Sequence, residues 1–448
     1  MNIVFLYPVQ RSMASWIVLL GSVFMVLIAC NETAPSPAAL AVTPISTQQE
    51  TTTPRLTQAQ LDAFAQFVQD NLAENDLPGA AVAIVQDTDI VLLQGFGTQD
   101  RNTNAPVTTE TLFHIGSTNK SMTAMMAATM VDDGLLTWDT RAVEIDEEFT
   151  LSDAAVTEQV TMRHLLSMRG SIQAASEDDL ANDSTAEDVF TYMAEEPLLG
   201  MPGTQFEYSN ISYALAGYLA AMADGELYGQ LYDGYARSLQ KRILDPIGMT
   251  NATIYASVAH ASPHMSKPHM DAGGQNCAVT ESIDADGDSL APSGALKANI
   301  SDMARYIMTQ VNEGVAPDGT RVVSAENLLE TWAPVAEDDD RYGLGWSRDT
   351  VNGVDVVSHE GSYDSFLSII GLMPAMNTGF VILANCEDGG GSLIDEGPKH
   401  LIALLVQASA QTEPDAVTEP DAVTEPDAVT EPSQTNQIYG LYLPVIRK

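Results

Sequence analysis

Residues Gly116–Gly134 read GSTNKSMTAMMAATMVDDG, a stretch that places Ser117 three residues before Lys120. The residues after Lys120 are good helix formers, and Gly134 marks a C-terminal stop. A spacing of three along a helix puts both side chains on one face, one turn apart. A serine hydroxyl becomes a nucleophile only with a base in hydrogen-bond reach. The stretch therefore predicts a helix that carries Ser117 as a nucleophile, provided that the rest of such a site is present.

Two further motifs follow in order. Tyr208 and Asn210 lie in the stretch FEYSNIS, just ahead of a helical pattern. His359, Gly361 and Ser362 lie much further on, in the stretch HEGS. Each residue alone has an ordinary structural explanation, such as a helix N-cap for a serine. Their occurrence together indicates a genuine site.

With Ser-x-x-Lys, Tyr-x-Asn and His-x-Gly in this order, the chain resembles the serine β-lactamase and penicillin-binding-protein superfamily. The likeness is to its class C β-lactamase and DD-peptidase side, and it spans roughly Leu56–Val406. The resemblance implies acyl transfer through a serine, with no metal and no cofactor. It also implies a site in the cleft between a sheet and a helical lobe.

Acyl transfer needs a nucleophile, a base and donors for the developing oxyanion. Ser117 is the expected nucleophile. Lys120 acts as a base only if a closed pocket depresses its pKa, and a phenol beside an ammonium ionises more easily, so Lys120 and Tyr208 are expected to share one proton-relay task. Asn210 is expected to hydrogen-bond Lys120 and the substrate amide.

By resemblance, the backbone N–H groups of Ser117 and Ser362 form the oxyanion hole, and Gly361 lets the strand approach the substrate closely. Many family members have lysine where His359 stands. An unperturbed histidine is mostly neutral at pH 7, so we expect a weaker grip on substrate carboxylates, or one that strengthens as the pH falls. Glu360 would raise the pKa of His359, although neighbouring strand residues point to opposite faces.

The pattern of apolar residues and breakers predicts an α/β fold of the α+β type. It comprises an antiparallel sheet flanked by helices plus a helical lobe, as in the β-lactamase/transpeptidase-like fold. The expected helices are Thr57–Leu77, several within 112–310, and Ile394–Ala408. The expected strands are Ala80–Ile84, Ile90–Gly95, Tyr342–Trp346, Val354–His359, Phe366–Met373 and Thr378–Ala384.

The N-terminal region reads as an export signal. Residues 1–29 contain Arg11 and then the apolar run Trp16–Ala29, which is short for a membrane span and typical of a signal peptide. The run ends in a lipobox-like LIAC, which predicts lipidation of Cys30. The alternative is an ordinary signal peptide with an incidental cysteine. Residues 30–55, rich in Thr, Pro and Ser, predict a tether, so the protein is expected to be extracytoplasmic and membrane-attached through its lipid.

The hydrolase domain is expected over 56–408. Residues 409–436 repeat TEPDAV, which predicts an extended acidic linker because such a sequence cannot build a core. The apolar-basic tail 437–448 fits a sorting or docking peptide and an ordered end equally well.

Composition limits the partners. The chain of 448 residues has 61 Asp and Glu against 19 Lys and Arg, a net charge of −42 that argues against nucleic acid. Cys277 and Cys386 are left over after Cys30, and the sequence leaves their pairing open. The sequence gives no indication of an oligomeric state.

The sequence argues against metal binding at two places that carry possible ligands. His260, His264 and His269 are separated by helix-breaking prolines, which argues against a shared metal. The DADGD stretch at Asp284–Asp288 has its glycine too early for a calcium loop, which predicts a solvated acidic turn.

These observations predict an exported serine hydrolase that forms an acyl-enzyme on Ser117 and acts on a small-molecule or peptide substrate, with peptide, amide or ester bonds favoured. A true class C-like β-lactamase or a carboxylesterase is the alternative among enzymes. A non-catalytic penicillin- or peptidoglycan-binding module is the alternative from another class.

Overall fold

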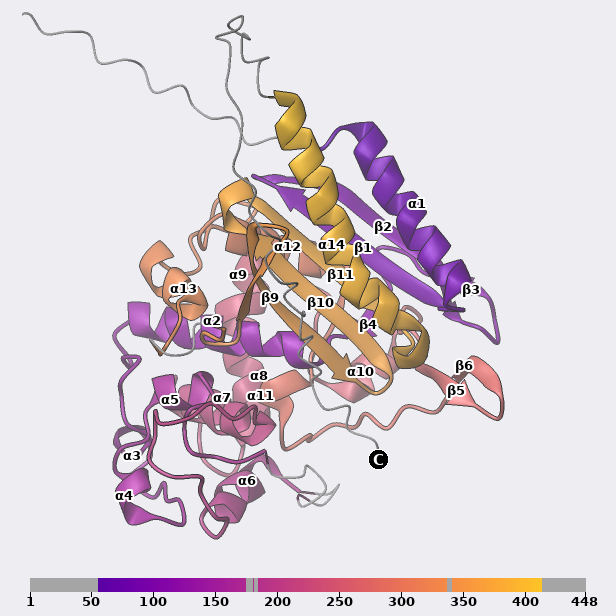
Figure 1. Cartoon of the computed structure of the whole chain (residues 1–448). Helices are drawn as coiled ribbons and strands as arrows, with labels where there is room; N and C mark the ends of the chain where they lie inside the picture. Colours follow the sequence, from indigo (N-terminus) through magenta and orange to yellow (C-terminus); the bar gives the residue numbers. More distant parts are fainter. Residues whose placement is uncertain (1–54, 175–179, 181–183, 337–340, 413–448) are drawn as a thin grey trace, which may run out of the picture. The chain divides into compact units, whose positions relative to one another are not determined.

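The computed structural model describes residues 55–174, 180, 184–336 and 341–412. Its centre is a seven-stranded antiparallel sheet with the strand order β3-β2-β1-β11-β10-β9-β8, flanked by helices (Figure 1). The first three strands and the last four come from opposite ends of the domain sequence, and the helical segments lie between them. This arrangement confirms the predicted fold class.

The strands of the main sheet are β1 (Gly79–Gln86), β2 (Asp89–Asp100), β3 (Ala105–Pro106), β8 (Ser347–Val351), β9 (Val354–Tyr363), β10 (Phe366–Met373) and β11 (Thr378–Ala384). Two small sheets pair β4 (Leu112–His114) with β7 (Lys297–Asn299) and β5 (His269–Ala272) with β6 (Gln275–Val279).

The α-helices are α1 (Gln58–Glu74), α2 (Asn119–Asp132), α3 (Ala142–Ile145), α4 (Ala154–Thr157), α5 (Met162–Leu166), α6 (Ala186–Met193), α7 (Asn210–Ala223), α8 (Leu231–Leu239), α9 (Asp245–Ile247), α10 (Ala256–Ala261), α11 (Ala291–Gly294), α12 (Ile300–Val311), α13 (Ala325–Trp332) and α14 (Glu387–Thr412). Short 3₁₀ turns occur at η1 (Gly116–Thr118) and η4 (Pro374–Met376), and η3 (Gln240–Leu244) is a π-helical turn.

The central strands are buried on both faces because helices cover each side. Val82 and Ile84 of β1 pack with Phe64 and Val68 of α1, whereas Ala83 belongs to the core on the other face. Successive side chains of a strand point to opposite faces, so one apolar run serves both cores. Helices α1 and α14 lie together over the first face (Figure 1). The second core extends from α12 through α2 into the helical lobe.

Two expected elements differ most from the structure. The predicted strand Tyr342–Trp346 is a turn, and the strand β8 begins only at Ser347, because the two glycines of YGLGW bend the chain instead of extending it. The predicted helix Ile394–Ala408 extends over Glu387–Thr412 and contains Pro398. The three consecutive glycines before Ile394 hid its first turns, because glycine is a poor helix former.

Cys277 of β6 and Cys386, which directly precedes α14, form a disulfide with a Cα–Cα distance of 5.8 Å. The bond fastens the β5–β6 hairpin to the end of the main sheet. The structure thus answers the question of pairing that the sequence left open.

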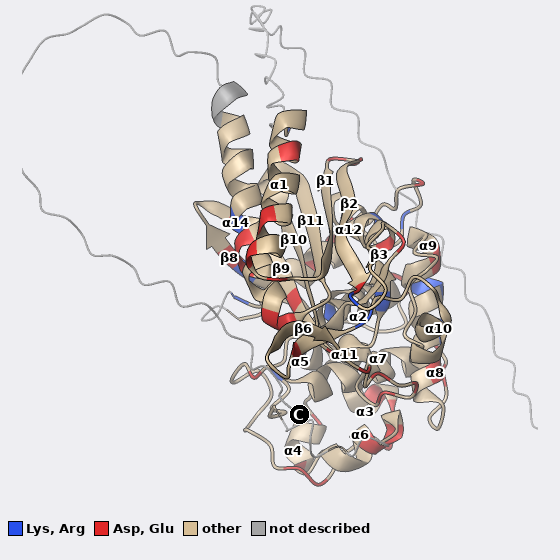
Figure 2. Cartoon of the chain, turned by 90° about the vertical axis from the view of Figure 1, so that its right-hand side faces the viewer, with Lys and Arg blue, Asp and Glu red and all other residues tan. Residues whose placement is uncertain are grey.

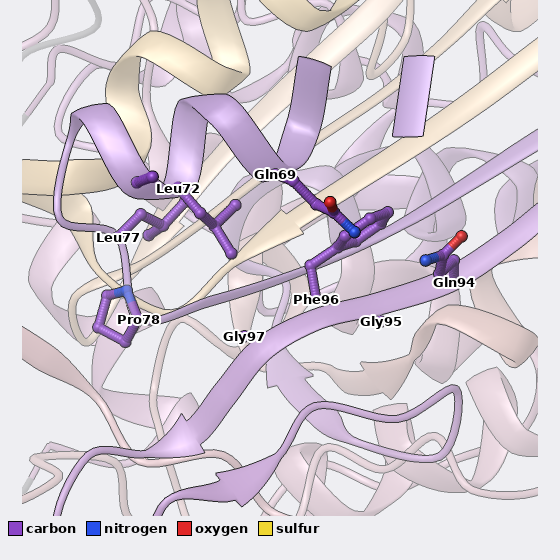
Figure 3. Close-up of a pocket in the computed structure, with 9 residues that line it drawn as sticks. Gln69, Leu72, Leu77, Pro78, Gln94, Gly95, Phe96 and Gly97 are labelled. Carbon is purple, nitrogen blue, oxygen red and sulfur yellow. The ribbon is translucent and has the colours of Figure 1, made fainter. Parts of the chain in front are cut away.

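Acidic residues outnumber basic ones in the sequence, with 61 Asp and Glu against 19 Lys and Arg. Figure 2 shows Asp and Glu residues on α1 and on the helices of the lobe. A shallow groove between α1 and β2 is lined by Leu72, Leu77, Pro78 and Phe96 among others, and it contains none of the predicted site residues (Figure 3). No helix in the described part of the chain is long and apolar enough to span a bilayer.

Candidate active site

The predicted nucleophile lies on a tight turn at the start of a buried helix. Ser117 is in the 3₁₀ turn η1, and α2 continues from Asn119. Ser117 and Lys120 are three residues apart across the junction of the turn and α2, a spacing at which helical side chains are neighbours. Gly116 has φ +52°, and a Cβ atom there would lie 2.7 Å from the backbone nitrogen of Ser362. The glycine therefore allows the turn to press against β9.

Three predicted residues meet at one oxygen atom. The Nζ of Lys120 lies 2.9 Å from the Oγ of Ser117, and the hydroxyl of Tyr208 lies 2.8 Å from the same Oγ. The Lys120 ammonium also lies 5.0 Å from the centroid of the Tyr208 ring. Lys120 and Tyr208 are thus both within reach of the Ser117 proton, and either can accept it after losing a proton of its own.

Lys120 is held from two more sides. Its Nζ donates to the Oδ1 of Asn210 at 2.6 Å and to the backbone carbonyl of Ser293 at 2.9 Å. Asn210 is the first residue of α7, and the N-cap Ser209 fixes that helix end by accepting from the Ser212 N–H. Lys120 has 0% exposure, and burying an ammonium among uncharged acceptors is costly. The three acceptors around Nζ match the three N–H groups of an ammonium, so Lys120 can act as a base only after it gives up one of these protons.

The HEGS strand borders the same turn. β8 pairs with Val354–Ser358 of β9, and the remainder of β9 runs past Ser117. A Cβ atom on Gly361 would lie 2.2 Å from the carbonyl of Ile115 and 3.0 Å from the nitrogen of Ser117, so only glycine permits this approach. The backbones of Ser117 and Ser362 are thereby brought side by side, as an oxyanion hole requires.

His359 is buried and held in one neutral form. Its Nδ1 lies 2.6 Å from the carbonyl of Glu360, an acceptor only, so Nδ1 carries the proton. Its Nε2, 3.1 Å from the hydroxyl of Tyr342, then accepts from that hydroxyl. Burial, and next the charge of Lys120, lower the pKa of His359 to about 3.

This direction corrects one expectation. Glu360 does act to raise the pKa of His359, through its carbonyl, but burial and Lys120 outweigh it. His359 is therefore neutral across pH 5–8, and the predicted strengthening of a carboxylate grip cannot fall in that range.

Two contributors to the site escaped sequence reasoning. The Ser293 carbonyl is a backbone group, so the residue type at position 293 does not predict its contact with Lys120. Tyr342 contacts His359 and also packs on Phe206, with ring centroids 5.2 Å apart. The sequence pattern of residues 342–346 predicts a strand, which hides the turn that this stretch forms beside the site.

Two of the three histidines of the possible metal site, His269 and His260, have separate protein partners. His269 is buried, with Nδ1 3.0 Å from the carbonyl of Asn385, and His260 faces Asp284. Among the described residues, no group of three His, Cys, Asp or Glu side chains is arranged to hold a metal ion.

The expectation of a solvated acidic turn at Asp284–Asp288 is wrong for its first residue. The Asp284 side chain is 1% exposed and lies 2.7 Å from Lys297 Nζ. The sequence concealed this burial because the partner lysine comes from a separate strand, β7.

An antiparallel sheet, a helical lobe and a half-buried serine beside a lysine and a tyrosine define a serine hydrolase of the β-lactamase and penicillin-binding-protein superfamily. A sequence model of the Beta-lactamase family matches residues 64–404, and the chain belongs to that family.

Individual relatives agree. The chain is 28% identical over 326 residues to penicillin-binding protein 4 of Amycolatopsis lactamdurans, covering 70% of this chain and 82% of the relative. It is 26% identical over 344 residues to the unguisins hydrolase ungD of Aspergillus violaceofuscus, covering 69% of this chain but only 58% of that protein. In fold, it is similar to an octameric penicillin-binding protein homologue from Pyrococcus abyssi, with a TM-score of 0.66, 22% identity, and 78% and 77% of the two chains covered.

Proposed function

We propose that this serine hydrolase works by forming an acyl-enzyme on Ser117. The observation that carries the proposal is the meeting of Lys120 Nζ and Tyr208 OH at Ser117 Oγ, at 2.9 and 2.8 Å. Both distances are within the reach of a general base. The backbone of Gly361 lies against the same turn, on the side where an oxyanion would form.

The steps follow from this geometry. Ser117 Oγ bonds to the carbonyl carbon while its proton passes to the Lys120–Tyr208 pair, and the oxyanion is held by the N–H groups of Ser117 and Ser362. The carbon–nitrogen or carbon–oxygen bond then breaks, and the leaving group takes that proton. Water repeats the sequence on the acyl-enzyme and restores the free serine. Positioned proton transfer of this kind contributes about 10²–10⁴-fold.

The neutral state of His359 bears on the substrate. A lysine at this position would offer a substrate carboxylate a fixed positive charge, whereas His359 with a pKa of about 3 offers none at neutral pH. This favours peptides, amides and esters that carry no carboxylate at this position over efficient β-lactam hydrolysis. DD-peptidase-like action on a peptide with a terminal carboxylate would need other groups to bind that carboxylate. The similarity to a protein named as a hydrolase of unguisins supports hydrolysis as the activity.

Reaction with penicillins is the second candidate, because a relative is named as a penicillin-binding protein. A protein that is acylated by penicillin and remains acylated would be a binding module instead of a β-lactamase. Hydrolysis rates decide between these functions. Wild-type protein and Ser117→Ala are compared on a p-nitrophenyl ester, a peptide ending in D-Ala-D-Ala and a chromogenic cephalosporin.

We expect Ser117-dependent turnover of the ester or the peptide, and slow or single turnover of the cephalosporin. Fast, repeated cephalosporin hydrolysis would make the protein a β-lactamase. Equal rates for wild-type protein and Ser117→Ala would contradict the proposed nucleophile.

We also propose that the protein is exported and anchored to a membrane through a lipid on Cys30, with no nucleic-acid partner. The signal segment and Cys30 lie outside the described residues. The Cys277–Cys386 disulfide supports the proposal, because disulfides persist in oxidising compartments. Phase partitioning in detergent tests it. Wild-type protein should enter the detergent phase and Cys30→Ala should not, and identical partitioning would overturn the anchor.

A further inference from the structure

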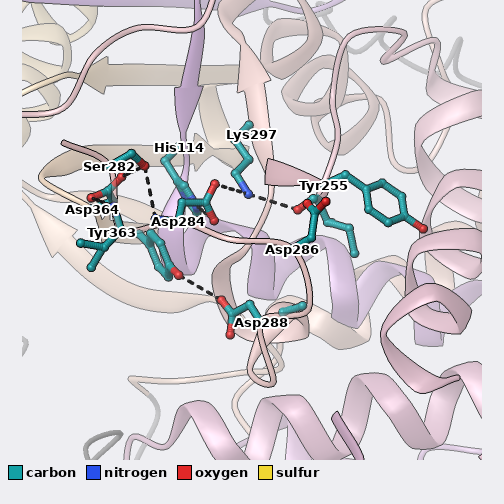
Figure 4. A network of polar contacts seen from close by, with 12 residues as sticks. His114, Tyr255, Ser282, Asp284, Asp286, Asp288, Lys297, Tyr363 and Asp364 are labelled. Atoms are coloured by element: carbon teal, nitrogen blue, oxygen red, sulfur yellow. Dashed lines mark hydrogen bonds and ion pairs between the residues drawn. The ribbon is translucent and has the colours of Figure 1, made fainter. Parts of the chain in front are cut away.

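A second polar cluster lies at the end of β9, the strand that carries Ser362 (Figure 4). We call it the brace, and its members come from the strands β4, β7 and β9, from the turn between β9 and β10, and from the loop before α11. They are His114, Asp284, Asp288, Lys297, Tyr363 and Asp364.

The inner part of the brace is an ion pair without solvent. Lys297 has 0% exposure, and its Nζ lies 2.7 Å from Asp284 Oδ2 and 3.1 Å from the carbonyl of Ile254. Burial opposes ionisation of Asp284, but its contacts with His114 and Lys297 outweigh burial and hold its pKa below the usual value. Asp284 is thus a fixed carboxylate on which the loop is anchored.

The outer part of the brace grips the turn after Ser362. The ring of Tyr363 stacks on His114 with centroids 4.0 Å apart, and its hydroxyl donates to Asp288 Oδ2 at 3.1 Å. Asp364 accepts from the Ser282 hydroxyl at 2.5 Å. Loop and turn are therefore tied at two places.

The turn needs such support. Asp364 and Ser365 have φ +50° and +66°, a left-handed pair that hairpins of this length usually fill with Asn-Gly or Asp-Gly. Residues without glycine's freedom persist in this region only where their surroundings hold them. The brace supplies that constraint immediately after the expected oxyanion donor.

The same loop reaches the other side of the nucleophile. Asp288 Oδ1 accepts from the Leu290 N–H at 2.8 Å, and the chain passes from there into α11. The carbonyl of Ser293 in α11 accepts from Lys120 at 2.9 Å. One segment therefore contacts both the strand of Ser362 and the base Lys120.

We propose that Tyr363 and Asp288 are positioning residues that hold the Ser362 N–H where the tetrahedral intermediate forms. The inference rests on the proposed acyl-enzyme function. Losing an oxyanion donor costs about 10²–10³-fold in kcat. Tyr363→Phe loosens the donor without removing it, so we expect kcat to fall about 10-fold with KM unchanged.

The experiment uses the full chain, a p-nitrophenyl ester and phenylboronic acid. The boron accepts the Ser117 oxygen and becomes tetrahedral, so its inhibition constant reports the oxyanion donors. Tyr363→Phe keeps the ring on His114 and removes only the hydroxyl. Tyr228→Phe is the matched control, because the Tyr228 hydroxyl donates to the carbonyl of Glu187, on the helical lobe.

We expect Tyr363→Phe to lower kcat and phenylboronic acid affinity together, each about 10-fold, while Tyr228→Phe changes neither. Asp288→Ala should reproduce the loss, and Asp288→Asn should restore the rate because its amide oxygen still accepts from Tyr363.

Unchanged kcat and affinity in folded Tyr363→Phe would overturn the positioning role alone. The role would also be overturned if the loss of activity in Tyr363→Phe matched its fraction of unfolded protein, so that the folded molecules kept the wild-type kcat. Wild-type protein that reacts with neither probe would contradict the proposed function itself.

Discussion

Lys120 and Lys297 are both completely buried, and the difference between them separates chemistry from structure. Lys120 donates to Ser117, Asn210 and the Ser293 carbonyl, all uncharged acceptors. Lys297 faces the Asp284 carboxylate at 2.7 Å. The Nζ of Lys120 lies 2.9 Å from Ser117 Oγ, where it can exchange a proton with the proposed nucleophile, whereas the Nζ of Lys297 is engaged in an ion pair. The first arrangement suits a base, and the second suits an anchor.

Replacing Lys120 should give the largest effect. Lys120→Met removes the proposed base and should slow acylation of Ser117 about 10²–10⁴-fold, with the free energy of unfolding unchanged or higher. Pre-steady-state release of p-nitrophenol and urea unfolding measure the two quantities. Lys399→Met, which changes a lysine paired with Glu396 on the surface, is the control. Retention of the wild-type rate in Lys120→Met would remove lysine from the mechanism.

Replacing Lys297 should lower the free energy of unfolding more than the reaction rate, the opposite of the result for Lys120. Lys297→Met leaves Asp284 buried without its cation and should lower the free energy of unfolding by about 3–5 kcal/mol. The double variant Lys297→Met/Asp284→Asn should recover most of that loss. Urea unfolding tests both variants. A rate loss per folded molecule as large as that of Lys120→Met would erase the distinction between the two lysines.

The surroundings of Lys297 should also create a pH dependence. Burial, and next the charge of Lys297, lower the pKa of His114 to about 4, below its ordinary value of about 6.5. The unfolded chain therefore binds this proton more readily, and stability falls as the pH drops from about 6.5 towards 4. From pH 7 to 5, wild-type protein should lose about 2 kcal/mol more than His114→Gln. Parallel stability curves would refute a neutral, buried His114.

The surroundings of Lys120 predict a smaller change in specificity. With a pKa of about 3, His359 stays neutral over pH 5–8. Its protonation should therefore not change the ratio of penicillin acylation to ester acylation in that range. His359→Lys adds a charge for the penicillin carboxylate and should raise that ratio about 10-fold, the difference between a neutral and a charge-assisted hydrogen bond. Stopped-flow rates for both substrates test this, and an unaltered ratio would exclude a carboxylate contact at residue 359.

The two lysines also show what the sequence can predict. Ser117, Lys120, Tyr208 and Gly361 were found because their motifs are local and their order along the chain is informative. The paired apolar strands and the helix α2 were predictable for the same reason. Lys297 was not singled out, because its partner is 13 residues away along the chain and on another element. Backbone contributors such as the Ser293 carbonyl, and the turn at Tyr342, depend on tertiary packing that no local pattern records.

The central claim is that Ser117 is a nucleophile activated by Lys120 and Tyr208. Its most direct test is the intact mass of the protein minutes after mixing with a p-nitrophenyl ester or a penicillin, followed by peptide mapping. We expect an acyl group on the peptide containing Ser117 in wild-type protein and none in Ser117→Ala. Folded wild-type protein that gains no mass and releases no product, or an equal adduct in Ser117→Ala, would contradict the account.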